Sequence, residues 1–358
     1  MQDALQNISR WLAQAVESGA SDLHLVVGHP PILRLHGELK ALDERILDEQ
    51  FAEAELLPLC PHEQRETFRE TRNLDFALRL ALDGGEQRFR ANYFFSGQHI
   101  GACFRVIPSE IPDFDWAGFP YELAERLVSI RNGLVLIAGV TGAGKTTSLA
   151  MLIDLLNQRG RCRIITIEDP IEFIHGRYRN SVVTQREVGQ DVQSFADGLK
   201  YGLRQDPDVL LVGEIRDRET AQLALSAAET GHLVFSTLHT RDAKGAVSRL
   251  TDLFPEAVQS DIRSQISLSL RAVISQHLVP GAETGGKREL AMEIMINNAP
   301  IRSGIRSGKF ESIDNNIQTG RADGMLTLDD SIRKLLRQGR ISRTTAEHFI
   351  SSPEILEL

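Results

Sequence analysis

Cysteine is scarce in this sequence, and no apolar run is long enough to cross a bilayer. The three cysteines, Cys60, Cys103 and Cys162, are scattered over 358 residues and form no CxxC pair. This spacing argues against a disulfide framework and a tetracysteine zinc site, and it fits a reducing compartment. No stretch approaches about 18 uninterrupted apolar residues, and residues 1–20 lack the apolar centre of a signal peptide. We therefore expect a cytoplasmic protein that reaches a membrane only through a partner.

The sequence also lacks an excess of basic charge. Its 40 Lys and Arg are outnumbered by 49 Asp and Glu, which gives a formal net charge of −9. Proteins that bind nucleic acids broadly carry a basic footprint. The charge balance therefore argues against nucleic acid as a general partner.

The length of the chain and a change in its residue pattern after about residue 107 predict two domains. Residues 1–107 begin with a helical pattern and continue with short segments rich in β-branched and aromatic residues, including a helix near 49–70. This pattern is typical of a small α+β domain with a mostly antiparallel sheet. Residues 108–120 contain three prolines and few periodic apolar positions, which predicts a linker.

From residue 121 to 358 the pattern changes to strands that alternate with helices. Strand patterns that are apolar throughout, joined by helical crossovers, predict a parallel α/β sheet covered on both faces. The tail from about residue 258 is predicted to be mainly helical, with long periodic segments over 258–278 and 327–350.

A glycine-rich loop lies between an apolar strand pattern and a helix pattern. The stretch GVTGAGKT fits G-x-x-x-x-G-K-[ST], in which backbone N–H groups and the start of a helix surround phosphate oxygens. We expect Lys145 to bridge the β- and γ-phosphates and the Thr146 hydroxyl to coordinate Mg²⁺. The predicted nucleotide-binding residues of the loop are Gly139, Val140, Thr141, Gly142, Ala143, Gly144, Lys145, Thr146 and Thr147.

Two further strand patterns end in acidic residues. In DPDVLLVGEIRD the apolar strand pattern leads to Glu214, which we expect to lie beside Mg²⁺ or the attacking water. IITIEDPIEF crowds carboxylates together, and these repel one another unless a cation or hydrogen-bond donors offset them. Glu168 or Glu172 is therefore the candidate general base, and the sequence does not choose between them. The alternatives are a surface acid at Glu214 and a solvated acidic loop at the other two positions.

Two histidines mark the ends of one predicted strand. ETGHLVFSTLHT places His232 before this strand and His239 after it. Parallel α/β sheets bind ligands at the carboxyl ends of their strands, so His239 is predicted to sense the γ-phosphate. His232 is predicted to be a further residue of the nucleotide site, and simple packing is the alternative for both histidines.

In chain order, GVTGAGKT, TIEDPIEF, LLVGEIRD and TGHLVFSTLHT resemble the Walker A, Asp, Walker B and His boxes of secretion and pilus motor ATPases. Other stretches extend the resemblance over nearly the whole chain: ASDLHLVVGHPPILRLHGEL, RFRANYF, FRVIPSEIP, QREVG, LRQDPD, VISQHLVP and AMEIMINNAPIRSGIRSGK. Together they are similar to the type IV pilus twitching-motility ATPases, the PilT/PilU group.

This resemblance implies a PAS-like N-terminal domain and a RecA-like C-terminal domain that hydrolyses ATP with Mg²⁺. It implies a homohexameric ring, peripheral to the inner membrane at the pilus base, whose hydrolysis drives pilus retraction. The implied partners are an inner-membrane pilus platform protein and related pilus ATPases. It also implies that Arg90 and Arg105, and less directly Arg88, reach the nucleotide from the N-terminal domain. The alternative is that these arginines pair with local acids.

One stretch departs from the pattern of the group. Retraction ATPases typically read AIRNLIRE where this chain reads PIRSGIRSGK. Ser303 and Gly304 weaken helix propensity, whereas Pro300 is tolerated in a first helical turn, so a short helix is expected here. The departure leaves open a main retraction motor, an accessory copy, or a paralogue for type IV secretion or another pilus-like system. More distant alternatives are a RecA-like nucleic-acid motor and a regulatory module that holds ATP without hydrolysing it.

Overall fold

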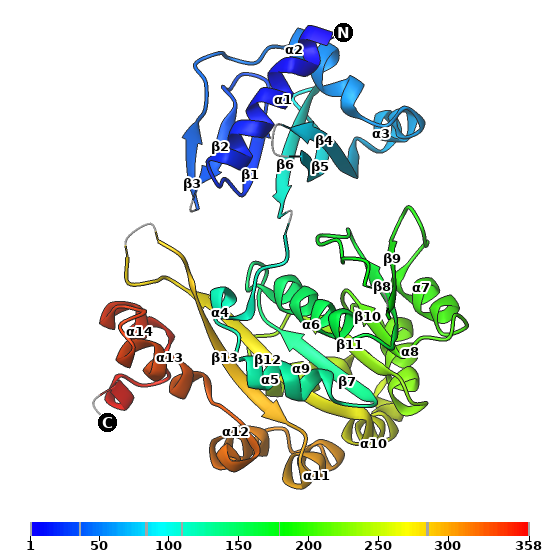
Figure 1. The fold of residues 1–358 in the computed structure, drawn as a ribbon, viewed down its shortest axis with the longest axis vertical. Coiled ribbons are helices and arrows are strands. Elements are labelled where there is room, and N and C mark those ends of the chain that lie inside the picture. The colour runs from blue at the N-terminus through cyan, green and yellow to red at the C-terminus, as the bar shows by residue number, and fades with distance from the viewer. Residues whose placement is uncertain are drawn as a thin grey trace. The chain divides into compact units, whose positions relative to one another are not determined.

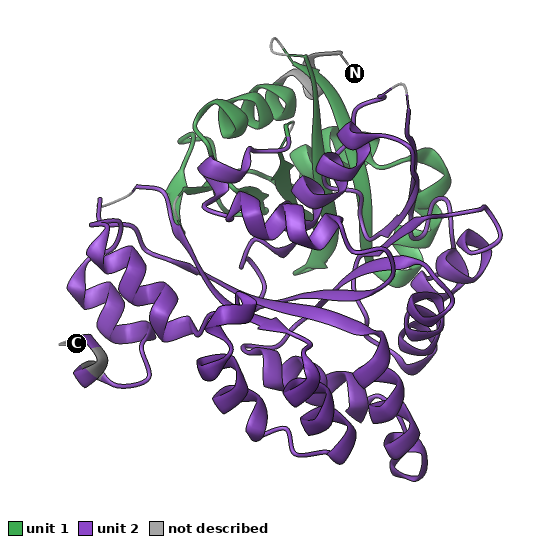
Figure 2. Ribbon diagram, turned by 60° about the horizontal axis from the view of Figure 1, so that its bottom comes forward, with its two compact units in different colours: residues 1–110 green, residues 111–358 purple. Residues whose placement is uncertain are grey.

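The computed structural model divides the chain into two compact units, Met1–Glu110 and Ile111–Leu358, each with its own hydrophobic core (Figures 1 and 2). It describes residues 2–35, 37–82, 85–108, 110–178, 180–283 and 286–356. The predicted α/β class is confirmed. The segment 108–120, predicted to be a linker, includes helix α4 (Phe114–Ala117) and the buried Phe119, and both pack into the second unit.

The first unit is an antiparallel six-stranded sheet with the order β3-β2-β1-β6-β5-β4. One face packs against helix α1 (Gln2–Glu17), whose Trp11 and Leu12 are fully buried among Leu23, Tyr93 and Phe104 of the sheet. The strands are β1 (Asp22–Leu25), β2 (Ile32–Leu35), β3 (Glu38–Ala41), β4 (Asn73–Leu82), β5 (Gly85–Ser96) and β6 (His99–Ile107).

The predicted helix near 49–70 is broken into short pieces. These pieces are α2 (Glu49–Phe51), a π-helical turn (Ala52–Leu56), two 3₁₀ turns (Leu57–Leu59 and His62–Gln64) and α3 (Arg65–Thr71). Pro58 and Pro61 lie at the breaks, where each proline removes a backbone donor.

The second unit contains a seven-stranded sheet with the order β13-β12-β7-β11-β10-β8-β9. All neighbouring pairs run parallel except β12 with β13. The strands are β7 (Gly133–Ala138), β8 (Arg163–Glu168), β9 (Val182–Glu187), β10 (Val209–Val212), β11 (Leu233–Leu238), β12 (Leu270–Val279) and β13 (Glu289–Ile296).

Helices cover both faces of this sheet (Figure 1). One face is covered by α5 (Tyr121–Val128) and α6 (Lys145–Arg159). The opposite core takes residues from α7 (Phe195–Gly202), α8 (Arg218–Glu229), α9 (Ala243–Asp252), α10 (Gln259–Ser269), α11 (Ala299–Ser307) and α12 (Ser312–Thr319). Helices α13 (Leu328–Arg337) and α14 (Arg343–Phe349) form a smaller cluster against β12 and β13.

The prediction of a mainly helical tail is wrong for two segments. The helix expected over 258–278 ends at Ser269, and Leu270–Val279 continues as the buried strand β12. Strand β13 follows, in a stretch for which no strand was predicted. A short apolar run cannot be assigned to helix or strand by periodicity alone, so the sheet decides. The short helix expected over the PIRSGIRSGK stretch is confirmed as α11, which is capped by Asn298 and has Pro300 in its first turn.

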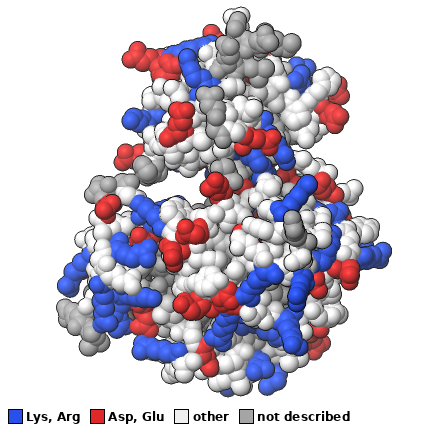
Figure 3. Space-filling model, viewed as in Figure 1, with Lys and Arg blue, Asp and Glu red and all other residues white. Residues whose placement is uncertain are grey.

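The surface of the second unit mixes the two signs of charge. Figure 3 shows acidic and basic side chains interspersed on the face that it presents. Among the described residues, no helix combines the length and apolar character needed to cross a membrane.

Candidate functional site

The carboxyl ends of neighbouring parallel strands bring the predicted boxes to one edge of the sheet. Strand β11 lies between β7 and β10, with Leu238 beside Ala138 and Ser236 beside Val212. The phosphate loop follows β7, Glu214 lies just beyond β10, and His239 follows β11 directly. Parallel α/β sheets place their ligands at this edge.

The loop conformation depends on its first glycine. Gly139 has φ 149°, and an added Cβ would lie 2.7 Å from the carbonyl oxygen of Gln276 and 2.9 Å from the Cβ of Ala143. Only glycine combines this backbone angle with so close an approach. Gly142 also has a positive φ of 79°, but its added Cβ would meet nothing within 4 Å.

This contrast gives a test of the loop geometry. We expect Gly139→Ala to lower the Tm of the nucleotide-free protein more than Gly142→Ala does. The first variant forces strand β12 away, at a cost of about 1–3 kcal/mol, whereas the second adds only local strain of about 1 kcal/mol. Thermal unfolding followed by circular dichroism measures both variants. Equal shifts in Tm would contradict the importance of the contact with Gln276.

Lys145 lies inside the loop that precedes it. Only 8% of the residue is exposed, and its Nζ donates to the carbonyl oxygens of Gly139 at 2.8 Å and Val140 at 3.1 Å. Burial lowers the pKa of Lys145, while the charges of Glu214 and Glu172 oppose that shift. A charged donor in such a low-dielectric position interacts strongly with phosphate oxygens.

Helix α6, which begins at Lys145, is anchored from behind by a residue that the sequence analysis did not assign. Gln276 of β12 is fully buried, and its Nε2 donates to the Ser148 hydroxyl at 2.7 Å. Its stretch VISQHLVP belongs to the resemblance, but nothing in the spacing of these residues predicts this contact. Gln276 therefore fixes the start of α6 through its side chain and crowds Gly139 through its backbone.

Glu214 and His239 are brought together. The Glu214 carboxylate lies 3.2 Å from His239 Nε2 and 2.6 Å from Arg216 Nε. Burial and the neighbouring Lys145 charge lower the pKa of His239, and Arg216 adds to that shift, whereas Glu214 opposes it. Lys145, Glu214 and His239 therefore form one electrostatically coupled group at the edge of the sheet. Arg216 belongs to this group and was not singled out from the sequence.

The two candidate bases differ in their surroundings. Glu168 ends strand β8 and is mostly buried, and its Oε1 accepts hydrogen bonds from Thr166 Oγ1 at 2.6 Å and Gln185 Nε2 at 3.2 Å. Glu172 lies on the following loop, and its charge opposes the lowering of the pKa of Lys145, as the charge of Glu214 does more strongly. Glu168 is thus held by its own strand and by β9, while Glu172 belongs to the electrostatic group around Lys145.

The structure does not bring His232 to this site. His232 precedes β11, and its backbone carbonyl accepts from Gly133, the first residue of β7. Its ring nitrogen Nδ1 lies 3.0 Å from the carbonyl oxygen of Ala227 at the end of α8. The amino end of a parallel strand faces away from the ligand edge of its own sheet. These contacts fit the packing alternative, and the binding of a nucleotide by His232 stays a prediction.

Arg90 and Arg105 lie opposite each other on β5 and β6 in the first unit. Arg90 Nε is 3.3 Å from Asp75 and Arg105 Nε is 2.9 Å from the buried Asp22. Both side chains are substantially exposed, on the sheet face opposite the apolar residues that pack against α1. Arg88, two residues before Arg90, is mostly buried.

The residues present suit Mg²⁺ bound together with a nucleotide. Within the described ranges, no group of three or more His, Cys, Asp and Glu residues could hold a metal alone. Mg²⁺ usually takes one or two protein ligands, with waters and substrate phosphates completing its shell. The Thr146 hydroxyl next to Lys145 and the Glu214 carboxylate supply such a set.

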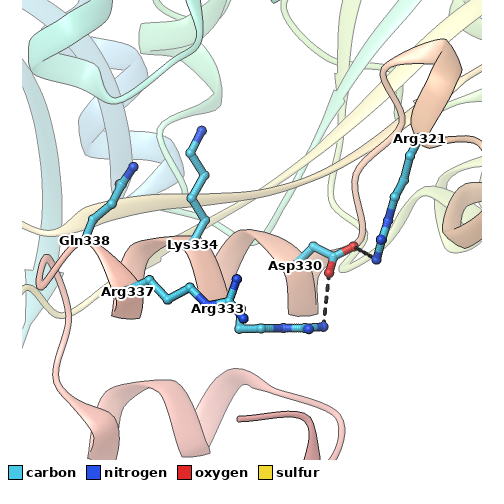
Figure 4. Close-up of a pocket in the computed structure, with 6 residues that line it drawn as sticks. All are labelled: Arg321, Asp330, Arg333, Lys334, Arg337 and Gln338. Carbon is cyan, nitrogen blue, oxygen red and sulfur yellow. Dashed lines mark hydrogen bonds and ion pairs between the residues drawn. The ribbon is translucent and has the colours of Figure 1, made fainter. Parts of the chain in front are cut away.

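A separate hollow of about 400 Å³ lies along α13. Asp330 is held there between Arg321 at 2.8 Å and Arg333 at 3.1 Å (Figure 4). Lys334, Arg337 and Gln338 complete the lining. None of these residues belongs to an element that carries the phosphate loop or its acids, so the hollow is distinct from the nucleotide site.

Comparisons with known proteins cover nearly the whole chain. The family model described as type II/IV secretion system protein matches residues 3–338. The type IV pilus retraction ATPase PilT of Pseudomonas aeruginosa is 42% identical over 348 residues, which cover 97% of this chain and 99% of that protein. The twitching motility protein of Neisseria gonorrhoeae is 40% identical, over 90% of this chain and 85% of that protein. A crystal structure of the pilus retraction motor PilT with bound ADP superposes with a TM-score of 0.85 at 40% identity, covering 98% of each chain.

Proposed function

Because the chain belongs to the type II/IV secretion system protein family and is an ATPase of the PilT twitching-motility group, we propose that it is a homohexameric motor that hydrolyses ATP to drive type IV pilus retraction. The observation that carries this proposal is the coupled group of Lys145, Glu214 and His239 beside the phosphate loop. Such a group places positive charge, a carboxylate and a phosphate sensor around one γ-phosphate.

Each residue has a separate part in the proposed reaction. Backbone N–H groups of residues 139–146 and the N-terminus of α6 bind the phosphates, and Lys145 neutralises charge on the β- and γ-phosphates. Thr146 and Glu214 would hold Mg²⁺, which supplies charge neutralisation at the phosphates when it is bound. His239, in contact with Glu214, responds to the presence of the γ-phosphate.

We assign the general base to Glu172. A base must accept a proton from water next to the γ-phosphate, so it must lie near the lysine that holds this phosphate. The charge of Glu172 acts on Lys145, whereas Glu168 accepts hydrogen bonds from Thr166 and Gln185. Glu168 then positions the loop that carries Glu172.

The assignment predicts unequal effects of two matched substitutions. We expect Glu172→Gln to lower the kcat for ATP about a hundredfold, because the amide cannot take up a proton. Glu168→Gln retains an acceptor for Thr166 and should lower kcat less than tenfold. Steady-state phosphate release measures both, with ADP binding as the control for an intact phosphate loop. The opposite order of effects would transfer the role of base to Glu168.

The cellular part of the proposal has its own test. Deleting the gene should leave pili that extend but do not retract, and the wild-type gene, but not a Lys145→Ala copy, should restore retraction.

Co-purification with the inner-membrane platform protein of the pilus would support a position at the pilus base, peripheral to the membrane. Capture of secretion components instead would favour a traffic ATPase of type IV secretion. The mass of the assembly, measured by sedimentation in the presence of ATP, tests whether six subunits form one ring.

A nucleic-acid motor makes a different prediction. DNA should then stimulate turnover, and the stimulation should fall steeply as salt is added. The net charge of −9 and the mixed charges in Figure 3 favour the pilus motor. We therefore expect the rate of ATP hydrolysis to be unchanged by DNA.

A further inference from the structure

The backbone that follows β11 is held in place by strands β12 and β13. We call residues 239–243 the His239 loop. The carbonyl oxygen of Arg241 accepts from Ser275 Oγ at 2.8 Å and lies 2.9 Å from His277 Nε2, both on β12. The N–H of Ala243 donates to Glu293 Oε1 on β13 at 2.7 Å. Three side chains of the neighbouring strands therefore fix the far end of the loop that begins with His239.

The Glu293 carboxylate lies at the N-terminus of α9. Ala243 is the first residue of this helix, so its N–H has no partner within the helix, while the N-cap Asp242 accepts from Gly245 N. The positive end of a helix favours an ionised carboxylate. The hydrogen bond from Ala243 to Glu293 therefore holds the loop most firmly when Glu293 is charged.

Several charges act on Glu293 from the elements around it. Burial raises the pKa of Glu293 to about 7, the hydrogen bond from Ala243 opposes this shift, and Asp242 and Asp314 add to it. Lys244 of α9 lowers the pKa of Glu293, and it pairs with Glu311 at 2.9 Å and Asp314 at 2.8 Å beside and within α12. On β12, Ser275 lies opposite Glu293 in register, and His277 lies two residues further along.

This arrangement connects the C-terminal helices to the nucleotide site. Asp314 of α12 pairs with Lys244 of α9. Ala243, the first residue of α9, donates to Glu293. The His239 loop joins Ala243 to His239, which contacts Glu214. We propose that Glu293 is a positioning residue whose ionised carboxylate fixes the His239 loop for hydrolysis and relays the position of α12 to His239. The proposal rests on the proposed function, because it concerns the same ATP site.

Replacing Glu293 with glutamine removes the charge and keeps an acceptor of similar shape. We expect wild-type kcat for ATP to rise between pH 6 and pH 8 as Glu293 ionises. Glu293→Gln should lack this rise, with kcat about fivefold below wild type at pH 8, near wild type at pH 6, and an almost unchanged Kd for ADP. Glu289→Gln, on the same strand but paired with Arg340, is the matched control and should follow the wild-type profile. Equal pH profiles for wild type and Glu293→Gln would overturn the proposal.

Stability tests whether Glu293 ionises over the pH range in which kcat is expected to rise. Burial raises the pKa of Glu293 in the native protein from its ordinary value of 4.5 to about 7. Its contribution to stability is therefore complete below about pH 4.5 and is lost as the pH rises through about 7. Glu293→Gln has no such loss, so its Tm relative to wild type should increase from pH 5 to pH 8. A difference in Tm that is the same at pH 5 and pH 8 would show that Glu293 does not ionise in this range, and it would contradict the proposed pH dependence of kcat.

Hydrogen exchange measures the hydrogen bond from Ala243 to Glu293 without any ATP hydrolysis. In the full-length protein, we expect the Ala243 amide to exchange about tenfold faster in Glu293→Ala than in wild type, with Glu293→Gln in between. If wild type hydrolyses no ATP, the proposed function fails while the exchange data still decide the role of Glu293. If wild type hydrolyses ATP but exchange at Ala243 is the same in all three proteins, the positioning role fails by itself.

Discussion

Lys145→Ala is expected to lower kcat/KM for ATP at least about a thousandfold. Lys145 is a mostly buried residue, and its ammonium is the cation of the coupled group that contains Glu214 and Glu172. Without it, the γ-phosphate would lie beside carboxylates with no lysine to offset their charge, so both nucleotide binding and the transition state should weaken. Phosphate release under steady-state conditions measures the first effect, and titration with a fluorescent ADP analogue measures the second.

Lys200→Ala is a suitable control because Lys200 is an exposed lysine of α7 that lies beside Tyr201. This variant should retain wild-type turnover. Substantial hydrolysis by Lys145→Ala, at more than about a tenth of the wild-type rate, would refute the assignment of the phosphate loop. The Tm of Lys145→Ala should stay close to that of wild type, because its donors contact only carbonyl oxygens of the same loop.

The parts of the site that were predictable from the sequence are those with local physical causes. The phosphate loop requires glycine at fixed spacings because the backbone itself binds phosphate, so GVTGAGKT could be recognised without any tertiary information. Glu214 and His239 follow apolar strand patterns, and the parallel sheet brings the ends of such strands together. The α/β class followed from the same alternation of strands and helices.

Other features depend on contacts between distant residues and could not be predicted. Glu168 and Glu172 are alike in sequence, and they are distinguished by tertiary contacts: Glu168 accepts hydrogen bonds from Thr166 and Gln185, whereas the charge of Glu172 acts on Lys145. His232 is as conspicuous in sequence as His239, yet it lies at the amino end of its strand. The role of Glu293 depends on a hydrogen bond from Ala243, 50 residues earlier in the chain.

The errors in the predicted secondary structure have a similar origin. Strand β12 is apolar over most of its length, and such a pattern fits a buried helix as well as a buried strand. It became a strand because β7 offers it a parallel edge and β13 an antiparallel one. The helix expected near 49–70 failed for a local reason, since Pro58 and Pro61 could have been read as breaks.

The second large effect is expected from the arginines of the first unit. From the resemblance to the PilT/PilU group we propose that Arg90 and Arg105 neutralise the charge that develops on the γ-phosphate, an effect worth about 10³–10⁵ in rate in other phosphoryl-transfer enzymes. We expect the double variant Arg90→Ala, Arg105→Ala to lower kcat at least about a thousandfold with little change in Kd for ADP. The exposed pair of Arg90 with Asp75 contributes about 0–1 kcal/mol, so its loss should alter the Tm only slightly. Removing Arg105 takes a cation away from the buried Asp22 carboxylate, so this substitution should lower the Tm, and the rates are compared well below it.

Arg79→Ala is the matched control, because Arg79 is an exposed strand arginine that pairs with Glu86 in the same sheet. It should retain the wild-type rate.

Mixing subunits then shows whether the arginines act on a neighbouring subunit. Rings assembled from Lys145→Ala subunits and Arg90→Ala, Arg105→Ala subunits contain no subunit with both halves of a site. If the arginines serve the phosphate loop of a neighbour, mixed rings should regain turnover that neither variant has alone. If mixed rings stay inactive, the arginines act within their own subunit. Wild-type turnover by the double variant alone would contradict any role of the two arginines in hydrolysis.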